Sequence, residues 1–206
     1  MDRRTVLGTA TAGAAALAIG SPILATVSAA DALEAPRRGR VFRHGVASGD
    51  PLPDAVLIWT RLTPTPASTP GSGKGPRVEV AWEVAADARF RRVVRHGRFQ
   101  TGPGRDHTVK VDVTGLEPET WYHYRFTYDG ITSPVGRTRT APPADATPDH
   151  LRFGVVSCAN LQAGWFSAYR GLAERDDLHA VLHLGDYLYE YGPGQYGYGI
   201  DDVDIR

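Results

Sequence analysis

A series of short segments with two-residue alternation, between residues 36 and 140, most limits how this chain can fold. Apolar side chains occupy every second position in segments 77–84, 107–113 and 121–128, and segment 55–59 is apolar on both faces. A period of two is typical of β-strands with one buried face, and the Gly, Pro and Asp residues between the segments indicate turns. We therefore predict a small β-sandwich domain over residues 36–140.

Two connections in this region have a predictable form. Asp129-Gly130 directly follows the last alternating segment and predicts a tight hairpin turn. Residues 63–76 are rich in Pro, Gly, Ser and Thr, which predicts a long surface loop rather than a core element. Four polar residues of the region are interpreted as ordinary loop or surface residues: His44, Asp50, His96 and His107.

The segment that leads into residues 121–128 resembles the tyrosine corner of fibronectin type III sandwiches. It reads Leu-Glu-Pro-Glu-Thr-Trp-Tyr over residues 116–122. In that motif a tyrosine hydroxyl, here that of Tyr122, forms a hydrogen bond with the backbone a few residues upstream. The resemblance implies a sandwich of the fibronectin type III or immunoglobulin-like class.

The pattern changes after a Pro-rich linker at residues 141–149. Runs typical of buried strands occupy residues 151–156 and 180–184. Between them, apolar residues recur with helical spacing at Trp165, Phe166, Tyr169, Leu172 and Ala173. A strand, a helix and a strand at this spacing predict a βαβ unit with parallel strands, whose sites form at the C-terminal strand ends. We therefore predict that residues 150–206 begin an α/β domain.

Candidate metal ligands follow the two predicted strands. Cys158 comes two positions after the first strand, Asp186 follows the second strand and Gly185, and Tyr189 lies three residues further on. A thiolate and a phenolate on one ion favour a strongly Lewis-acidic metal such as iron, and a bridging carboxylate suits a hard second ion. The residues alone leave alternatives open: Cys158 as a buried small hydrophobe, Asp186 as a turn residue and Tyr189 as a loop aromatic. His183 is interpreted as a hydrogen-bonded core histidine.

Four segments of the sequence, two in each predicted domain, resemble the PhoD-like alkaline phosphatases, a family of metallophosphoesterases. Residues 42–51, Phe-Arg-His-Gly-Val-Ala-Ser-Gly-Asp-Pro, and residues 56–61, Val-Leu-Ile-Trp-Thr-Arg, resemble the opening of the family's N-terminal domain. Residues 154–158 together with residues 183–192 resemble the metal-binding start of its catalytic domain.

This resemblance implies a particular site and reaction. It implies that Cys158, Asp186 and Tyr189 hold iron (Fe3+), that calcium lies alongside, and that the aspartate bridges the two ions. It also implies two-metal hydrolysis of phosphate mono- and diesters, with a phosphate ester as the substrate. No catalytic residue separate from these ligands is predicted.

The resemblance further implies that the catalytic centre needs a later Gly-Asn-His segment, which the printed sequence lacks. Residues 150–206 are also few for a sheet that is covered on both faces. We therefore expect an N-terminal, incomplete copy of the enzyme that hydrolyses no aryl phosphate esters by itself. The alternative, from another functional class, is an exported, non-catalytic β-sandwich module for binding or adhesion, with a remnant catalytic segment.

Residues 1–32 have the layout of an export signal, with a charged start, an apolar stretch and a small-residue end that permits cleavage after Ala30 or Ala32. Arg3-Arg4 and the residues that follow resemble a twin-arginine signal, which implies passage through the twin-arginine machinery to the cell envelope or the extracellular space. Ordinary export and a retained anchor are the alternatives. An anchor is disfavoured because the segment is rich in Ala, Gly and Thr and is broken by Ser21-Pro22.

The charge balance gives no sign of two kinds of partner. The 23 Lys and Arg residues equal the 23 Asp and Glu residues in number, so no global field directs the chain to nucleic acid or an acidic membrane. The sequence has no nucleic-acid-binding signature. Its single cysteine excludes an intramolecular disulfide.

Overall fold

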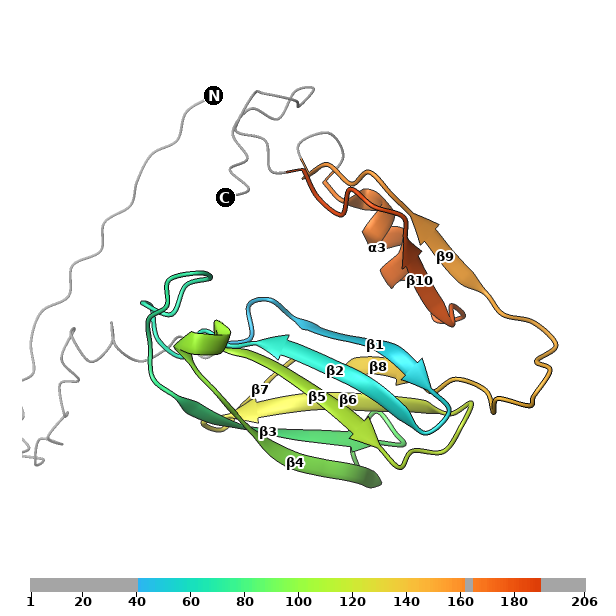
Figure 1. Cartoon of the computed structure of the whole chain (residues 1–206), viewed down its shortest axis with the longest axis horizontal. Helices are drawn as coiled ribbons and strands as arrows, with labels where there is room; N and C mark the ends of the chain where they lie inside the picture. The colour runs from blue at the N-terminus through green and yellow to red at the C-terminus, as the bar shows by residue number, and fades with distance from the viewer. Residues whose placement is uncertain (1–40, 162–164, 190–206) are drawn as a thin grey trace, which may run out of the picture. The chain divides into compact units, whose positions relative to one another are not determined.

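The computed structural model describes residues 41–161 and 165–189 (Figure 1). The predicted export signal at residues 1–32, and residues 190–206 of the predicted second domain, lie outside the described residues. In chain order the described elements are β1 (Val46–Leu52), β2 (Ala55–Arg61), β3 (Val78–Ala85), β4 (Val93–Thr101), the 3-10 helix η1 (Pro103–Arg105), β5 (Thr108–Thr114), β6 (Trp121–Tyr128), β7 (Ile131–Thr132), β8 (Gly136–Arg139), β9 (Phe153–Val156), α3 (Ser167–Ala173) and β10 (Ala180–His183).

Strands β1 to β8 form two layered antiparallel sheets, a β-sandwich (Figure 1). One sheet has the order β1-β2-β5, and the other has the order β4-β3-β6-β7 with β8 also paired to β6. The predicted alternation is confirmed, because apolar side chains on one face of each sheet meet in a shared core. The fully buried members of that core include Ile58, Val80, Val84, Val109 and Phe126.

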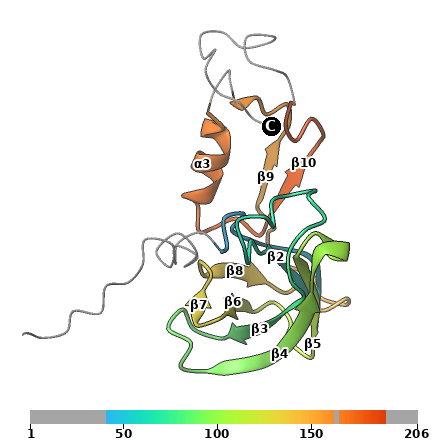
Figure 2. The ribbon, with the colours of Figure 1, turned by 90° about the vertical axis from the view of Figure 1, so that its left-hand side faces the viewer.

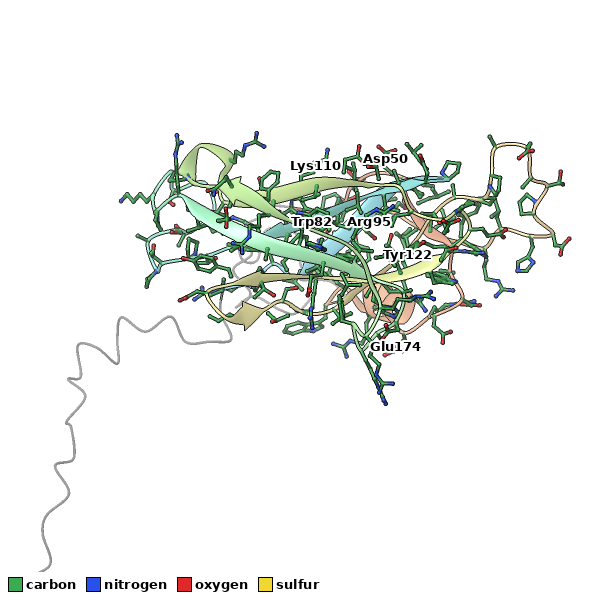
Figure 3. The ribbon with its side chains drawn as sticks, turned by 90° about the horizontal axis from the view of Figure 1, so that it is seen from below. Asp50, Trp82, Arg95, Lys110, Tyr122 and Glu174 are labelled. Atoms are coloured by element: carbon green, nitrogen blue, oxygen red, sulfur yellow. The ribbon has the colours of Figure 1, made fainter. Side chains whose placement is uncertain are left out.

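The tyrosine corner predicted from residues 116–122 is present. The hydroxyl of Tyr122 accepts a hydrogen bond from the backbone N–H of Glu117 at 2.9 Å. Thr140 closes the same corner, since its hydroxyl donates to the Glu117 carbonyl at 2.7 Å and accepts from the Thr120 N–H at 3.0 Å. The loop before β6 is therefore tied to the strand by side-chain hydrogen bonds (Tyr122 is labelled in Figure 3).

Replacing Tyr122 with phenylalanine is expected to lower the free energy of unfolding by about 1–2 kcal/mol, because a backbone donor in a partly buried corner loses its partner. Urea denaturation checks this value. Tyr128→Phe is the control, since Tyr128 ends the same strand outside the corner and is only partly buried. An equal loss in both variants would contradict a specific role for the corner.

The turn between β6 and β7 has the predicted form. Asp129 and Gly130 have φ angles of 48° and 71°, so both central residues are left-handed. Tyr128 and Ile131 then pair directly across the hairpin. A left-handed pair is the geometry that a two-residue hairpin turn requires, and the short side chain of aspartate tolerates it.

The loop at residues 63–76 is mostly exposed, as predicted, but one buried arginine holds it in place. The Arg61 side chain is 4% exposed and forms two 3.0 Å hydrogen bonds to the carboxylate of Asp106. It also donates to the Ser68 carbonyl at 3.0 Å and contacts the ring of His44 at 3.3 Å. Asp106 accepts the Gly71 N–H at 3.0 Å, and the hydrogen bonds from Arg61 hold the pKa of Asp106 below its usual range.

The interpretation of His107 as a loop or surface residue was wrong in one respect. His107 lies in the turn before β5, but it is 1% exposed and its Nε2 lies 3.0 Å from the Pro76 carbonyl oxygen. The imidazole therefore fills the space under residues 63–76. A turn position predicts an exposed side chain only where no other loop covers the turn.

The second predicted unit is present as two short parallel strands and a helix (Figure 2). Strand β9 pairs with β10 from Phe153 opposite Ala180 to Val156 opposite His183. Helix α3 packs on β9 at Gly154, where an added Cβ would lie 2.7 Å from Leu172 Cδ2. Among the residues that the structure describes, no helix has the length and apolar character needed to cross a lipid bilayer.

The helix begins later than its apolar spacing predicts. Trp165 and Phe166 have φ angles of 53° and 52°, which exclude them from a right-handed helix, and α3 begins at Ser167. Trp165 is 59% exposed. The predicted apolar stripe is therefore correct only from Tyr169 onwards.

Candidate metal centre

The hydrogen-bond ladder between β9 and β10 continues past the C-terminal ends of both strands. The Leu184 N–H donates to the Val156 carbonyl at 2.9 Å, and the Cys158 N–H donates to the Gly185 carbonyl at 3.2 Å. One step further, the Ala159 N–H donates to the Asp186 carbonyl at 3.0 Å. The backbone itself therefore holds the segment around Cys158 beside the segment around Asp186.

The side chains of Cys158, Asp186 and Tyr189 converge on one carboxylate oxygen. Asp186 Oδ2 accepts a hydrogen bond from the Tyr189 hydroxyl at 2.9 Å and lies 3.5 Å from the Cys158 sulfur. Asp186 and Cys158 are exposed and Tyr189 is partly exposed. The structure thus brings together the three residues that the sequence singled out, and their role as metal ligands stays a prediction.

Two of these residues have an uncommon backbone conformation. Cys158 and Asp186 have φ angles of 57° and 49°, both in the left-handed region. Such a conformation is rare for residues other than glycine, and it persists where the surrounding structure imposes it, often at functional sites. Gly185, with φ at 119°, supplies the sharp change of direction between strand β10 and Asp186.

The hydrogen bonds within the cluster affect the protonation of the phenol. The bond to Cys158, followed by the bond to Asp186, raises the pKa of Tyr189 well above its usual range. Tyr189 therefore carries its proton at neutral pH when only protein groups surround it. A cation that binds to the phenolate oxygen has to displace that proton.

His183 is hydrogen-bonded, as predicted, but it lies at a half-buried position rather than in a core. Its Nε2 lies 2.7 Å from the Tyr169 hydroxyl oxygen, and its Nδ1 accepts the Gly185 N–H at 3.3 Å. The Tyr169 hydroxyl donates to the Tyr187 carbonyl at 2.8 Å. Both ring nitrogens of His183 are therefore engaged in positioning the segment that carries Asp186.

The sequence analysis missed the role of Tyr169 because its position in a helical stripe predicted a packing residue. Its ring does pack, with ring centroids 5.9 Å from His183 and 6.0 Å from Tyr187. Its hydroxyl also joins helix α3 to the segment after β10. One signal in the sequence could have indicated this role: Tyr169 has a polar hydroxyl within an apolar stripe, and a half-buried hydroxyl usually forms a hydrogen bond.

The donor set suits part of a metal site. Within residues 41–161 and 165–189, no group of three or more His, Cys, Asp or Glu side chains is placed to hold an ion. The cluster instead combines one thiol, one carboxylate and one phenol within 3.5 Å of a shared oxygen. These donors fit a Lewis-acidic ion such as iron, with coordination positions left for further ligands. A hollow of about 260 Å³ borders Cys158 on the side of helix α3.

Comparisons with known proteins agree for the sandwich and for the unit that follows it. The family model for the N-terminal domain of PhoD-like phosphatases matches residues 26–142, and the model for PhoD-like phosphatase matches residues 153–206. Alkaline phosphatase D of Bacillus subtilis is 43% identical over 183 residues, which is 88% of this chain and 31% of that protein. The solved structure of PhoD matches with a TM-score of 0.70 at 44% identity, over 79% of this chain and 31% of that one. The chain therefore spans about a third of the length of these relatives.

Proposed function

The chain belongs to the PhoD-like phosphatase family, and we propose that it forms part of an exported, metal-dependent enzyme that hydrolyses phosphate mono- and diesters. The likeness to alkaline phosphatase D supports a phosphoric ester hydrolase. The match of the second family model to residues 153–206 favours this reading over a non-catalytic adhesion module, because that segment carries the metal donors.

The observation that carries the proposal is the convergence of Cys158, Asp186 and Tyr189 at the ends of two parallel strands. In this proposal the three side chains would hold iron, and the Asp186 carboxylate would also serve as a ligand for calcium. When bound, such ions lower the pKa of a coordinated water and neutralise charge on phosphate oxygens.

The chain's own residues have separate tasks in this site. Cys158 and Tyr189 provide two charged donors to one ion, and the position of Asp186 between them suits a bridge. His183 and Tyr169 hold the backbone on either side of Asp186 through Gly185 and Tyr187. The first three residues therefore bind the ion, and the other two orient the segment that binds it.

We also propose a division of the chain that follows the sequence pattern. Residues 1–32 form a twin-arginine signal peptide, residues 36–140 the fibronectin type III-like sandwich, residues 141–149 a linker and residues 150–206 the start of the catalytic domain. The ranges of the two family models support the last three assignments. An extracellular or cell-envelope location follows from the signal.

Spectroscopy of the iron-loaded chain tests the assignment of Tyr189. A phenolate bound to Fe3+ gives a visible charge-transfer band, so the chain with added Fe3+ is expected to be coloured. Tyr189→Phe is expected to lose the band, because it removes the phenolate donor. The matched control is Tyr187→Phe, which changes a tyrosine two residues away that is 68% exposed and contributes only its carbonyl to the local hydrogen bonds.

A band that survives in Tyr189→Phe, or that disappears equally in Tyr187→Phe, would show that Tyr189 is not the phenolate ligand. Absence of any band in the unmodified chain would count against iron at this site. Circular dichroism of both variants checks that the fold is retained.

A further inference from the structure

The turn between β3 and β4 carries an unusual concentration of positive charge. Arg89, Arg91 and Arg92 lie within four consecutive residues, and all three are exposed. No ion pair involves any of them within the part of the chain that the structure describes. Other exposed arginines on the same sheet do have carboxylate partners, as Arg98 has in Glu79. The turn therefore presents three guanidinium groups that form no ion pair with a described carboxylate, and the charge of Arg91 is offset in part by the nearby Asp87 carboxylate.

The turn is held in place by its backbone and not by its arginine side chains. The carboxylate of Asp87 accepts hydrogen bonds from the backbone N–H groups of Arg89, Arg91 and Arg92 at 3.0, 3.2 and 2.8 Å. The Ala86 N–H also donates to the Arg92 carbonyl at 3.0 Å. These backbone hydrogen bonds hold the pKa of Asp87 below its usual range, the one from Arg92 most strongly. The arginine side chains are thus presented on a fixed scaffold.

The neighbouring groups favour electrostatic contacts over apolar insertion or base stacking. Phe90 is the aromatic residue of the turn, and the guanidinium of Arg125 lies 4.0 Å from its ring centroid. Arg125 is fixed there by an ion pair with Glu83 at 2.7 Å. Arg95, further along β4 and labelled in Figure 3, donates to the backbone carbonyl of Thr114 at 3.0 Å and to that of Gly115. Within residues 41–161 and 165–189, Arg95 forms no ion pair with a carboxylate either.

We propose that the β3–β4 turn, residues 86–92, binds a linear polyanion with repeating phosphate groups. Each guanidinium can form paired hydrogen bonds with phosphate oxygens, and adjacent arginines suit adjacent phosphates of a chain. Because acidic and basic residues are equal in number, the net charge of the chain does not add to this attraction. The binding surface belongs to the sandwich and does not depend on the metal centre.

Binding of the full chain to fluorescently labelled inorganic polyphosphate tests the proposal. In buffer with a metal chelator, the unmodified chain is expected to bind, with an affinity that falls as salt rises. The triple variant R89Q/R91Q/R92Q is expected to bind at least about tenfold more weakly, with a slope of log affinity against log salt that is lower by about 2. The substitutions leave the backbone hydrogen bonds to Asp87 in place.

The matched control removes the same net charge elsewhere in the sandwich. R77Q/R105Q/K110Q changes three exposed basic residues outside the turn and is expected to bind within about twofold of the unmodified chain. R89K/R91K/R92K keeps the charge but loses the paired hydrogen bonds, so its affinity is expected to lie between those of the unmodified chain and the glutamine variant. Asp186→Asn is expected to leave polyphosphate binding unchanged, which separates this proposal from the proposed metal site.

Three outcomes would overturn the proposal: no binding of polyphosphate by the unmodified chain, an equal loss of binding in the R77Q/R105Q/K110Q control, or binding only to anionic lipid vesicles or only to single-stranded DNA. The first would show that polyphosphate is not a ligand of the chain. The second would show that the turn is not where it binds. The third would show that the arginines bind another class of partner. Thermal unfolding of the triple variant excludes loss of fold as the cause of weaker binding.

Discussion

Replacing Asp186 with asparagine is expected to lower the affinity of the chain for iron by at least about 100-fold, because loss of an outer-shell partner alone costs about 10–100-fold in metal affinity and this change affects a proposed direct donor. Asp186 Oδ2 is the atom on which the Cys158 and Tyr189 side chains converge. An amide at this position is uncharged and presents only one oxygen. Competition between the chain and a chelator of known affinity, followed by elemental analysis, measures the loss.

The control for this experiment is Asp176→Asn. Asp176 is an exposed aspartate between helix α3 and strand β10, and its replacement removes the same charge from the same unit. Its effect on iron affinity is expected to be less than about twofold, since long-range attraction between exposed charges is weak in salt. If the two variants lost iron equally, the carboxylate of Asp186 would be acting only through its charge, and the proposed coordination would be wrong.

Phe126→Ala is expected to lower the free energy of unfolding of the sandwich by about 3–5 kcal/mol, the usual cost of a large cavity in a core. The Phe126 side chain is 0% exposed and meets the Tyr124 ring edge-on, with ring centroids 6.2 Å apart at 83°. Truncation removes this contact as well as the apolar surface that Phe126 buries. Urea denaturation followed by tryptophan fluorescence measures the change.

Phe153→Ala is the matched control, because Phe153 is 44% exposed at the start of β9. Its cost is expected to be below about 1 kcal/mol. A loss below about 1 kcal/mol for Phe126→Ala would mean that the core collapses around the missing ring, contrary to the packing described above.

Alternation of apolar and polar residues in the sequence predicted the strands that bury one face. It did not predict the strands that are mostly exposed or contain a bulge. Strand β6 alternates buried and partly exposed residues along nearly its whole length, so its period of two is visible in the sequence. Strand β4 forms the edge of its sheet, and most of its side chains are exposed whichever way they point. Strand β1 contains a bulge, with Asp50 at a φ of 49°, which disrupts its pattern.

The three side chains of the candidate site could be predicted from the sequence, but the contacts that hold them in place could not. Residues that follow parallel strands meet at one edge of a sheet, so the proximity of Cys158 to Asp186 follows from the topology alone. The left-handed conformations of these two residues leave no signal in a single sequence, since they depend on the backbone contacts around Gly185. The hydroxyl of Tyr169 bonds to groups that lie far along the chain, and local patterns do not register such contacts.

The extension of the β9–β10 ladder to Ala159 and Asp186 has a consequence for how an ion is captured. Each backbone hydrogen bond beyond the strand ends restricts residues that a free loop would have to order at the moment of binding. Ordering one backbone residue costs about 1–2 kcal/mol of conformational entropy. That cost is met here when the chain folds, so a cation at the proposed site would meet residues whose backbone already has few conformations to lose.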